Sequence, residues 1–229
     1  MIVDREPAQA SHILKVVPIA GIRKTMADSC MQSSAVPQFT QVALADATEL
    51  EKRKRDARSS LTYMDLLLDA VCRAAIEVRD VLCAYSAGNA VHFRHADIGI
   101  ATATDRGLLI PVLRRAETMS LSERAPQWRR LIERTRNAAI DDDETMHPSI
   151  VLSNLGNSAV DFCTPLLAPG VSTVVAFGAL SRRPFAVGSK IEARPSIYIS
   201  TSFDHRIIDG EISSRFTSTL KGFIEHRMG

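Results

Sequence analysis

The stretch of sequence that decides the fold is Ser200-Thr201-Ser202-Phe203-Asp204-His205-Arg206-Ile207-Ile208-Asp209-Gly210. Side chains that alternate at Ile197, Ile199 and Thr201 predict a strand that leads into this stretch. The spacing of Ile212, Phe216, Leu220 and Phe223 predicts an amphipathic helix after it. His205 therefore occupies a strand-to-helix junction, where a rigid scaffold often presents a catalytic side chain. Because histidine ordinarily titrates near pH ~6.5, such a side chain can accept and release protons at neutral pH.

Three further motifs precede this stretch in a fixed order. They are residues 21–27 (GIRKTMA), residues 98–101 with 107–112 (IGIA and GLLIPV), and residues 152–156 (LSNLG). Together with DHRIIDG at residues 204–210, they resemble the dihydrolipoyl acyltransferases, the core subunits of 2-oxo acid dehydrogenase complexes. The resemblance extends over about residues 17–224. It implies an α/β chain of the chloramphenicol acetyltransferase-like, CoA-dependent acyltransferase fold, in which a mixed β-sheet packs with helices.

Length, composition and net charge limit the class of protein and the kinds of partner to expect. The 229 residues are 45% apolar and 24% charged, as in an ordinary globular protein, and suffice for one large domain or two small ones. A net charge of +2 gives no reason to expect nucleic acid or an anionic membrane as a partner. No apolar run approaches the ~18 residues of a membrane span. The scattered cysteines Cys30, Cys72, Cys83 and Cys163 are interpreted as reduced core thiols of a cytoplasmic protein.

Residues 1–12 are polar and expected to be loose, and residues 13–229 are expected to form a single acyltransferase domain. A lipoyl or peripheral-subunit-binding domain is not expected within this length. The chain is therefore either a catalytic core cut from a longer protein or a stand-alone enzyme.

Apolar spacing predicts alternating strands and helices, which indicates an α/β layer fold. Strands are expected at residues 14–18, 40–44, 90–93, 98–103, 150–153 and 171–177, and helices at residues 22–30, 48–60, 62–78 and 120–132. Pro126 should delay or kink the last of these helices. The basic run at 52–55 and the acidic run at 141–144 are interpreted as solvated surface, not as nucleic-acid or metal sites.

Site roles follow from the resemblance. His205 would be the general base and Ser153 would donate a hydrogen bond to the oxyanion. Asp209, four residues after the base, is a further candidate catalytic residue by its spacing, but the resemblance implies a supporting role, in which it would pair with Arg23 and hold the histidine loop in shape. The family places its active sites between neighbouring subunits, so a homotrimer is expected. A metal is not expected, although His92, His95 and His147 are alternative candidates for a metal or acid–base role.

Three positions depart from the family pattern. Gln38 stands in place of a histidine, His147-Pro148 in place of a glycine pair, and Ala168-Pro169 where a turn usually carries asparagine. Base and oxyanion donor remain, so these departures leave the acyl donor and acceptor open.

The leading interpretation is transfer of an acyl group from a dihydrolipoyl thioester, carried in trans on a lipoyl domain, to coenzyme A. A thiamine-dependent 2-oxo acid decarboxylase would be a further partner. The phosphopantetheine thiol of an acyl carrier protein is an alternative acceptor, because it ends in the same thiol as coenzyme A. A non-catalytic oligomeric scaffold and an antibiotic O-acetylating enzyme remain as further alternatives. The trimer is not expected to close into a cage, because Met228 is the only strongly apolar residue after Ile224.

Overall fold

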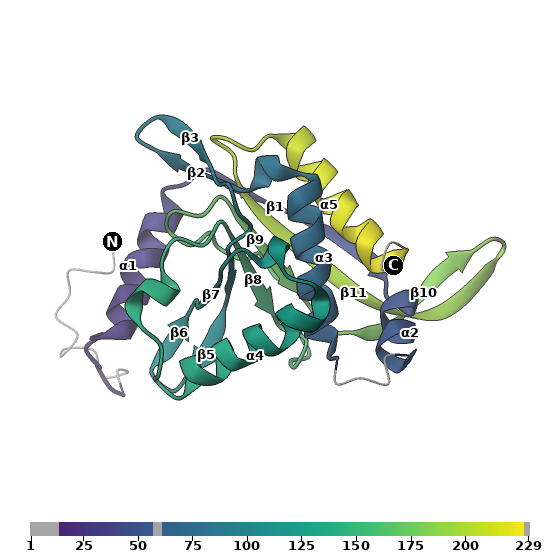
Figure 1. Ribbon diagram of the computed structural model, residues 1–229, viewed down its shortest axis with the longest axis horizontal. Coiled ribbons are helices and arrows are strands. Elements are labelled where there is room, and N and C mark those ends of the chain that lie inside the picture. Colours follow the sequence, from purple (N-terminus) through teal and green to yellow (C-terminus); the bar gives the residue numbers. More distant parts are fainter. Residues whose placement is uncertain (1–13, 57–60, 227–229) are drawn as a thin grey trace.

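The computed structural model describes residues 14–56 and 61–226, so the expectations for residues 1–12 and for Met228 lie outside the described residues. Helices and strands alternate through this part of the chain, which confirms the predicted α/β class (Figure 1). The helices are α1 (Ile22–Ser34), α2 (Thr48–Asp56), α3 (Tyr63–Glu77), α4 (Leu121–Arg136) and α5 (Gly210–Glu225). The strands are β1 (Gln38–Asp46), β2 (Cys83–Ser86), β3 (Asn89–His92), β4 (Ile98–Ile100), β5 (Thr102–Thr104), β6 (Gly107–Leu109), β7 (Val112–Leu113), β8 (Ile150–Asn154), β9 (Thr173–Phe177), β10 (Ser181–Val187) and β11 (Lys190–Asp204). Of the described helices, none is long and apolar enough to cross a membrane.

The main sheet has seven strands in the order β1-β11-β9-β8-β4-β7, with β10 paired to β11. Strands β4, β8 and β9 run parallel to their neighbours in this group, and the other pairs are antiparallel. The sheet is therefore mixed, as predicted. Two small hairpins, β2–β3 and β5–β6, stand apart from it.

Strand β11 is the longest strand of the sheet, lies next to the edge strand β1 and ends at the motif that contains His205. It pairs with β1 on one side and with β10 and then β9 on the other. Ile199 and Phe203 are fully buried, and the Phe203 ring meets Phe216 of α5 edge-on, with ring centroids 6.2 Å apart. The strand and the helix on either side of residues 205–209 are thus held against each other by one core.

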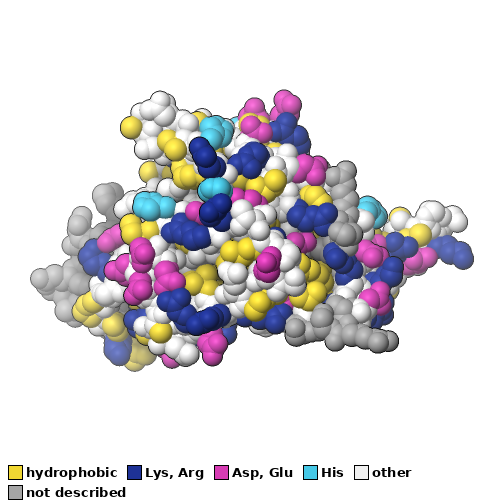
Figure 2. Space-filling view, viewed as in Figure 1, with side chains coloured by type: hydrophobic (Ala, Val, Ile, Leu, Met, Phe, Trp, Pro, Cys, Tyr) yellow, Lys and Arg dark blue, Asp and Glu magenta, His cyan; other side chains and the backbone are white. Residues whose placement is uncertain are grey.

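Helices α3 and α5 lie side by side over one face of the sheet, and α1 lies near the β5–β6 hairpin (Figure 1). Both predicted capping boxes are present, at Thr62 with Asp65 for α3 and at Ser120 with Glu123 for α4. On the face drawn in Figure 2, basic and acidic side chains are interspersed. This mixture agrees with the small net charge.

Three local expectations were wrong. The described residues from 14 to 20 form no strand, and Leu14 is fully exposed, because alternation alone does not supply a neighbouring strand. Pro126 does not delay the start of α4, which begins at Leu121, since a proline at this position removes only the bond to the carbonyl of the exposed Ser122. Cys30 is exposed rather than in the core, whereas Cys72 and Cys83 are buried.

Candidate active site

His205 lies in the turn between β11 and α5, and its side chain is exposed. Its backbone N–H donates to the carbonyl of Pro37 at 2.8 Å, just before β1. The imidazole ring packs on Phe39, with ring centroids 4.5 Å apart and planes inclined by 49°. The backbone and one ring face are therefore fixed, while the side chain remains open to a ligand or another chain.

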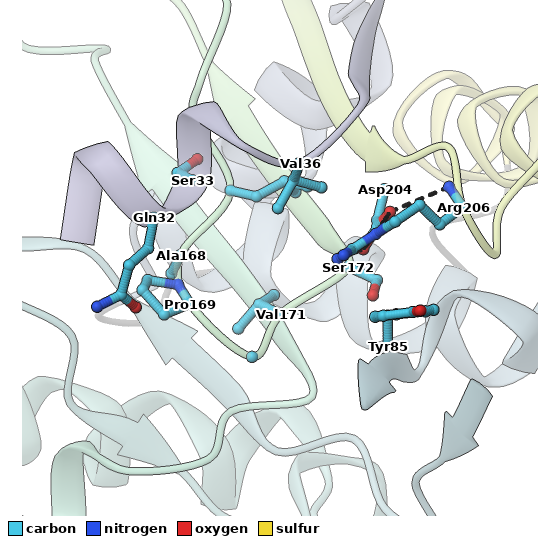
Figure 3. A pocket seen from close by; sticks show the side chains of 12 residues that line it. Gln32, Ser33, Val36, Tyr85, Ala168, Pro169, Val171, Ser172, Asp204 and Arg206 are labelled. Atoms are coloured by element: carbon cyan, nitrogen blue, oxygen red, sulfur yellow. Dashed lines mark hydrogen bonds and ion pairs between the residues drawn. The ribbon is translucent and has the colours of Figure 1, made fainter. Parts of the chain in front are cut away.

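The two neighbours of His205 in the sequence form an ion pair that the sequence analysis missed. Arg206 donates from Nε and Nη2 to the buried carboxylate of Asp204, at 2.9 and 2.7 Å. The Arg206 guanidinium also lies over the Tyr85 ring, 4.0 Å from its centroid (Figure 3). Hydrogen bonding to Asp204 raises the pKa of Arg206 above its ordinary value. This fork holds the backbone on both sides of His205, and the acid-x-Arg spacing was the signal for it.

Asp209 begins α5. Its Oδ1 accepts a hydrogen bond from the backbone N–H of Ile212 at 2.9 Å, which is the geometry of a helix N-cap. Arg23 is exposed on α1, and within the described part of one chain it makes no ion pair. The expected Arg23–Asp209 pair is therefore not formed within a single chain. The carboxylate supports the histidine loop by capping the helix instead.

Ser153 comes from the third motif and lies near the end of β8, opposite Ala176 of β9. It is half-buried and faces a pocket of about 440 Å³. Other walls of this pocket come from Met26 of α1, Leu108 of β6 and Leu166. His205 is not among the described residues that line it. One chain therefore supplies Ser153 and His205 to different places.

Gln38, where the family has a histidine, serves a structural purpose. Its amide nitrogen donates to the carbonyl and hydroxyl oxygens of Ser33, at 2.8 and 3.1 Å. Its amide oxygen accepts from the backbone N–H of Leu167 at 3.0 Å. The side chain thus ties the end of α1 to the segment that carries Leu166 and Leu167, so it helps to shape the Ser153 pocket.

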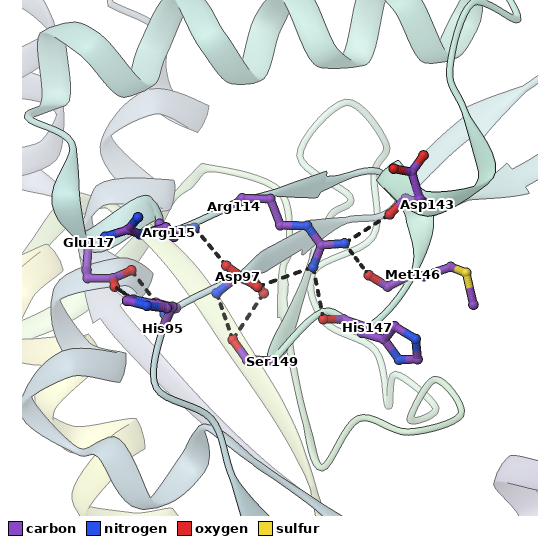
Figure 4. Close-up of polar contacts among 10 residues, drawn as sticks. His95, Asp97, Arg114, Arg115, Glu117, Asp143, Met146, His147 and Ser149 are labelled. Carbon is purple, nitrogen blue, oxygen red and sulfur yellow. Dashed lines mark hydrogen bonds and ion pairs between the residues drawn. The ribbon is translucent and has the colours of Figure 1, made fainter.

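His147, a candidate for acid–base or metal chemistry, belongs to a polar cluster around Arg114 (Figure 4). Arg114 donates to Asp97 at 3.2 Å and to the carbonyls of Met146 and His147, at 2.7 and 3.3 Å. His147 has a φ of 54°, the left-handed conformation that glycine adopts most easily. The histidine at this family glycine position therefore keeps a glycine-like backbone.

His95, a second candidate, contacts Glu117, with Nδ1 and Oε1 2.6 Å apart (Figure 4). Burial by itself would raise the pKa of Glu117, but hydrogen bonds from His95 and from the backbone of Ala96 outweigh it, so the pKa is lowered. Glu117 holds the chain just before β4, which gives His95 a supporting role. Within residues 14–56 and 61–226, no cluster of three or more His, Cys, Asp or Glu side chains could hold a metal ion.

The fold and these motifs define an acyltransferase catalytic domain. The 2-oxoacid dehydrogenases acyltransferase (catalytic domain) family matches residues 12–228, so the chain belongs to this family. The chain is 30% identical over 225 residues to the lipoamide acyltransferase component of the branched-chain alpha-keto acid dehydrogenase complex of Pseudomonas aeruginosa. That match covers 94% of this chain and 53% of the relative. The chain thus spans about half the length of the curated relatives it matches.

Solved structures agree with this assignment. The cubic core of a pyruvate dehydrogenase multienzyme complex is 26% identical, with a TM-score of 0.91 and coverage of 98% of this chain and 97% of that one. The Azotobacter vinelandii dihydrolipoamide acetyltransferase is 27% identical, with a TM-score of 0.87 and coverage of 94% and 93%. That structure was solved to study a serine, a histidine and an asparagine in its catalytic mechanism.

A chloramphenicol acetyltransferase is 15% identical, with a TM-score of 0.63 and coverage of 91% of this chain and 99% of that one. At this identity the likeness concerns the fold alone. It confirms the fold class that the sequence motifs predicted.

Proposed function

We propose that this chain transfers an acyl group from a dihydrolipoyl thioester to the thiol of coenzyme A, with His205 as general base and Ser153 as oxyanion donor. The observation that carries the proposal is the placement of His205: an exposed imidazole in a turn whose backbone is fixed on both sides. The Azotobacter relative supports it, because a histidine and an asparagine four positions apart were studied there for their catalytic role, and His205 and Asp209 have the same spacing.

The proposed reaction is direct transfer between two thiols. His205 takes the proton from the incoming thiol as its sulfur attacks the thioester carbonyl. The carbonyl oxygen becomes an oxyanion, which accepts a hydrogen bond from the Ser153 hydroxyl. When the intermediate collapses, the C–S bond to the lipoyl sulfur breaks and the imidazolium returns its proton to that sulfur. Atoms and charges balance without an acyl-enzyme.

The active site is proposed to form between neighbouring chains of a homotrimer. Within one chain Ser153 faces a pocket that His205 does not line, which supports a site in which one chain brings His205 to the Ser153 pocket of the next. A lipoyl domain would deliver the thioester in trans, after loading by a thiamine-dependent 2-oxo acid decarboxylase. The relatives support these partners, since they are components of such complexes.

Mixed assemblies test the chemistry and the shared site together. His205→Ala alone should lower turnover ~10²–10⁴-fold, the usual effect of a positioned base. Co-expression of His205→Ala chains with Ser153→Ala chains should restore activity, because some interfaces then pair an intact histidine with an intact serine. Random mixing in equal amounts predicts about one quarter of wild-type activity for a head-to-tail ring.

No recovery in the mixture would show that both residues act within one chain. Full turnover by the His205→Ala variant would refute the role of His205 as general base. The acceptor is decided by a parallel assay, with coenzyme A in one reaction and a phosphopantetheinylated acyl carrier protein in the other. Both acceptors end in the same thiol, so the two reactions differ only in what carries it.

A further inference from the structure

The pocket beside Ser153 has uncharged walls. Seventeen described residues line it, and none of them is an acid, a lysine, an arginine or a histidine. The hydroxyl-bearing residues are Thr25, Ser29 and Ser153, and most of the remaining walls are aliphatic. A ligand in this pocket would lose contact with water without gaining an opposite charge.

Helix α1 turns its basic residues away from the pocket. Residues 22, 25, 26, 29 and 30 line the pocket, and this i, i+3, i+4 spacing places them on one helix face. Lys24 lies off this face and pairs with Asp28 at 2.8 Å. Arg23 is exposed and does not line the pocket. Neither basic side chain of this turn is therefore a wall of the pocket.

One wall of the pocket is closely packed against the sheet. Ile110 lines it, and the position that a Cβ on Gly99 would take is only 2.7 Å from Cγ2 of Ile110. Only glycine at position 99 lets Ile110 pack this closely against β4. Gly99 therefore allows the Ile110 wall of the pocket to lie close to β4.

We propose that this pocket receives the acyl chain and selects uncharged, apolar acyl groups over acyl groups that end in a carboxylate. The inference rests on the proposed function, because Ser153 as oxyanion donor fixes the thioester carbonyl at this wall. The acyl chain then extends along the aliphatic side chains of Leu108, Ile110 and Val151. Among the walls that this chain supplies, a terminal carboxylate would find no cation, which makes its burial there strongly unfavourable.

Two acyl donors of equal length test this selectivity. Butyryl-CoA and succinyl-CoA both carry four-carbon acyl groups, but the methyl end of one is a carboxylate in the other. With dihydrolipoamide as acceptor, the reverse reaction should show a kcat/KM at least ~100-fold higher for butyryl-CoA. Equal or better use of succinyl-CoA would overturn the proposal.

Exposed wall residues allow the selectivity to be changed without disturbing the core. Leu108 and Leu166 are 45% and 55% exposed, so Leu108→Arg and Leu166→Arg are compatible with folding. Either cation should shift the butyryl-to-succinyl ratio toward succinyl by ~10-fold or more. The matched control is Val91→Arg on β3, which is 43% exposed and does not line the pocket, and it should leave the ratio unchanged. If both wall variants altered only the KM for dihydrolipoamide, the pocket would hold the lipoyl arm and the proposal would be wrong.

Cys30 supplies a readout that does not need turnover. Its thiol is exposed and lines the pocket, whereas burial raises the pKa of Cys72 and of Cys83 to about 11. Butyryl-CoA should slow alkylation of Cys30 more than succinyl-CoA does, with Cys163, which does not line the pocket, as the internal reference. Equal protection by both donors would overturn the selectivity. If neither donor were turned over, the proposed function would fail, and the protection pattern would still decide what the pocket admits.

Discussion

Ser153 is held by the sheet, and this determines what its removal should do. The residue pairs with Ala176 across parallel strands, so a smaller side chain leaves the backbone in place. Ser153→Ala should lower kcat ~10²–10³-fold, the usual cost of removing one oxyanion donor. The KM should change little, because the hydrogen bond strengthens mainly in the transition state.

The matched control is Ser158→Ala, which removes a nearby hydroxyl that donates to the carbonyl of Leu155 at 2.7 Å. That variant should keep its kcat, since the hydroxyl is occupied by the loop itself. Steady-state kinetics on the two variants separates catalysis from local structure. A change confined to KM in Ser153→Ala would make the serine a substrate-binding residue.

His147 occupies a backbone conformation that favours glycine. With a φ of 54°, this exposed histidine occupies a conformation that costs a residue with a Cβ about 1–2 kcal/mol. His147→Gly removes this cost but adds the greater flexibility of glycine in the unfolded chain. We therefore expect a net gain of about 0.5–1 kcal/mol in the free energy of unfolding.

Chemical denaturation of His147→Gly and His147→Ala provides the comparison. The His147→Ala variant loses the imidazole but keeps the left-handed conformation, so its free energy of unfolding should not increase. Equal stability of the glycine and alanine variants would show that the conformation is not the cause.

At the level of elements, the junction between β11 and α5 depends on Asp209, the N-cap residue that precedes the helix. Asp209→Ala removes the N-cap that Ile212 N–H uses, which should cost ~0.5–2 kcal/mol of stability. Asp209→Asn keeps a side-chain oxygen in the same place and should be close to wild type, since asparagine caps helices as well as aspartate does. Urea denaturation of both variants measures the difference.

The same pair of variants decides between the cap and the expected ion pair with Arg23. If a charge–charge contact with Arg23 of a neighbouring chain mattered most, Asp209→Asn would lose as much stability as Asp209→Ala. In that case Arg23→Gln should show the same loss.

Elements that bury one face could be predicted from the sequence. The stripe from Ile212 to Phe223 gave α5, and the capping boxes gave the starts of α3 and α4, because each signal is local. The hairpin formed by β10 and residues 190–194 of β11 was missed: Ile191 is 80% exposed there, and neither segment contains a buried residue, so no buried face marks them. Leu14 and Val16 alternate without forming a strand, because pairing depends on a neighbour that the local pattern does not contain.

In the candidate site, too, local patterns could be predicted from the sequence and contacts between distant residues could not. Motifs located His205 and Ser153, since each lies at the end of a strand with a recognisable pattern. The Asp204–Arg206–Tyr85 contact joins the turn to a hairpin more than a hundred residues earlier, so its Tyr85 part could not be predicted from spacing. Cys30 of α1 was assigned to the core, although it is exposed and lines the Ser153 pocket together with Met26, which is 46% exposed.

For the whole molecule, the separation of the two site residues within a chain is the main constraint. Exposed apolar side chains border the Ser153 pocket at Met26, Leu108 and Leu166, where a neighbouring chain could cover them. His205 is exposed at the other half of the proposed site. A head-to-tail arrangement that joins unlike surfaces closes into a ring when the rotation between copies allows it.

We therefore expect the purified chain to be a trimer and its activity to depend on assembly. Light scattering should give a mass near three chains of 25.1 kDa, and dilution below the association range should reduce the specific activity as single chains appear. Circular dichroism at the same dilution is the control, because retained helix signal shows that the loss comes from separation and not from unfolding. A larger particle built from trimers would leave the shared site intact. A monomer with full turnover would contradict it, since His205 and Ser153 would then have to act within one chain.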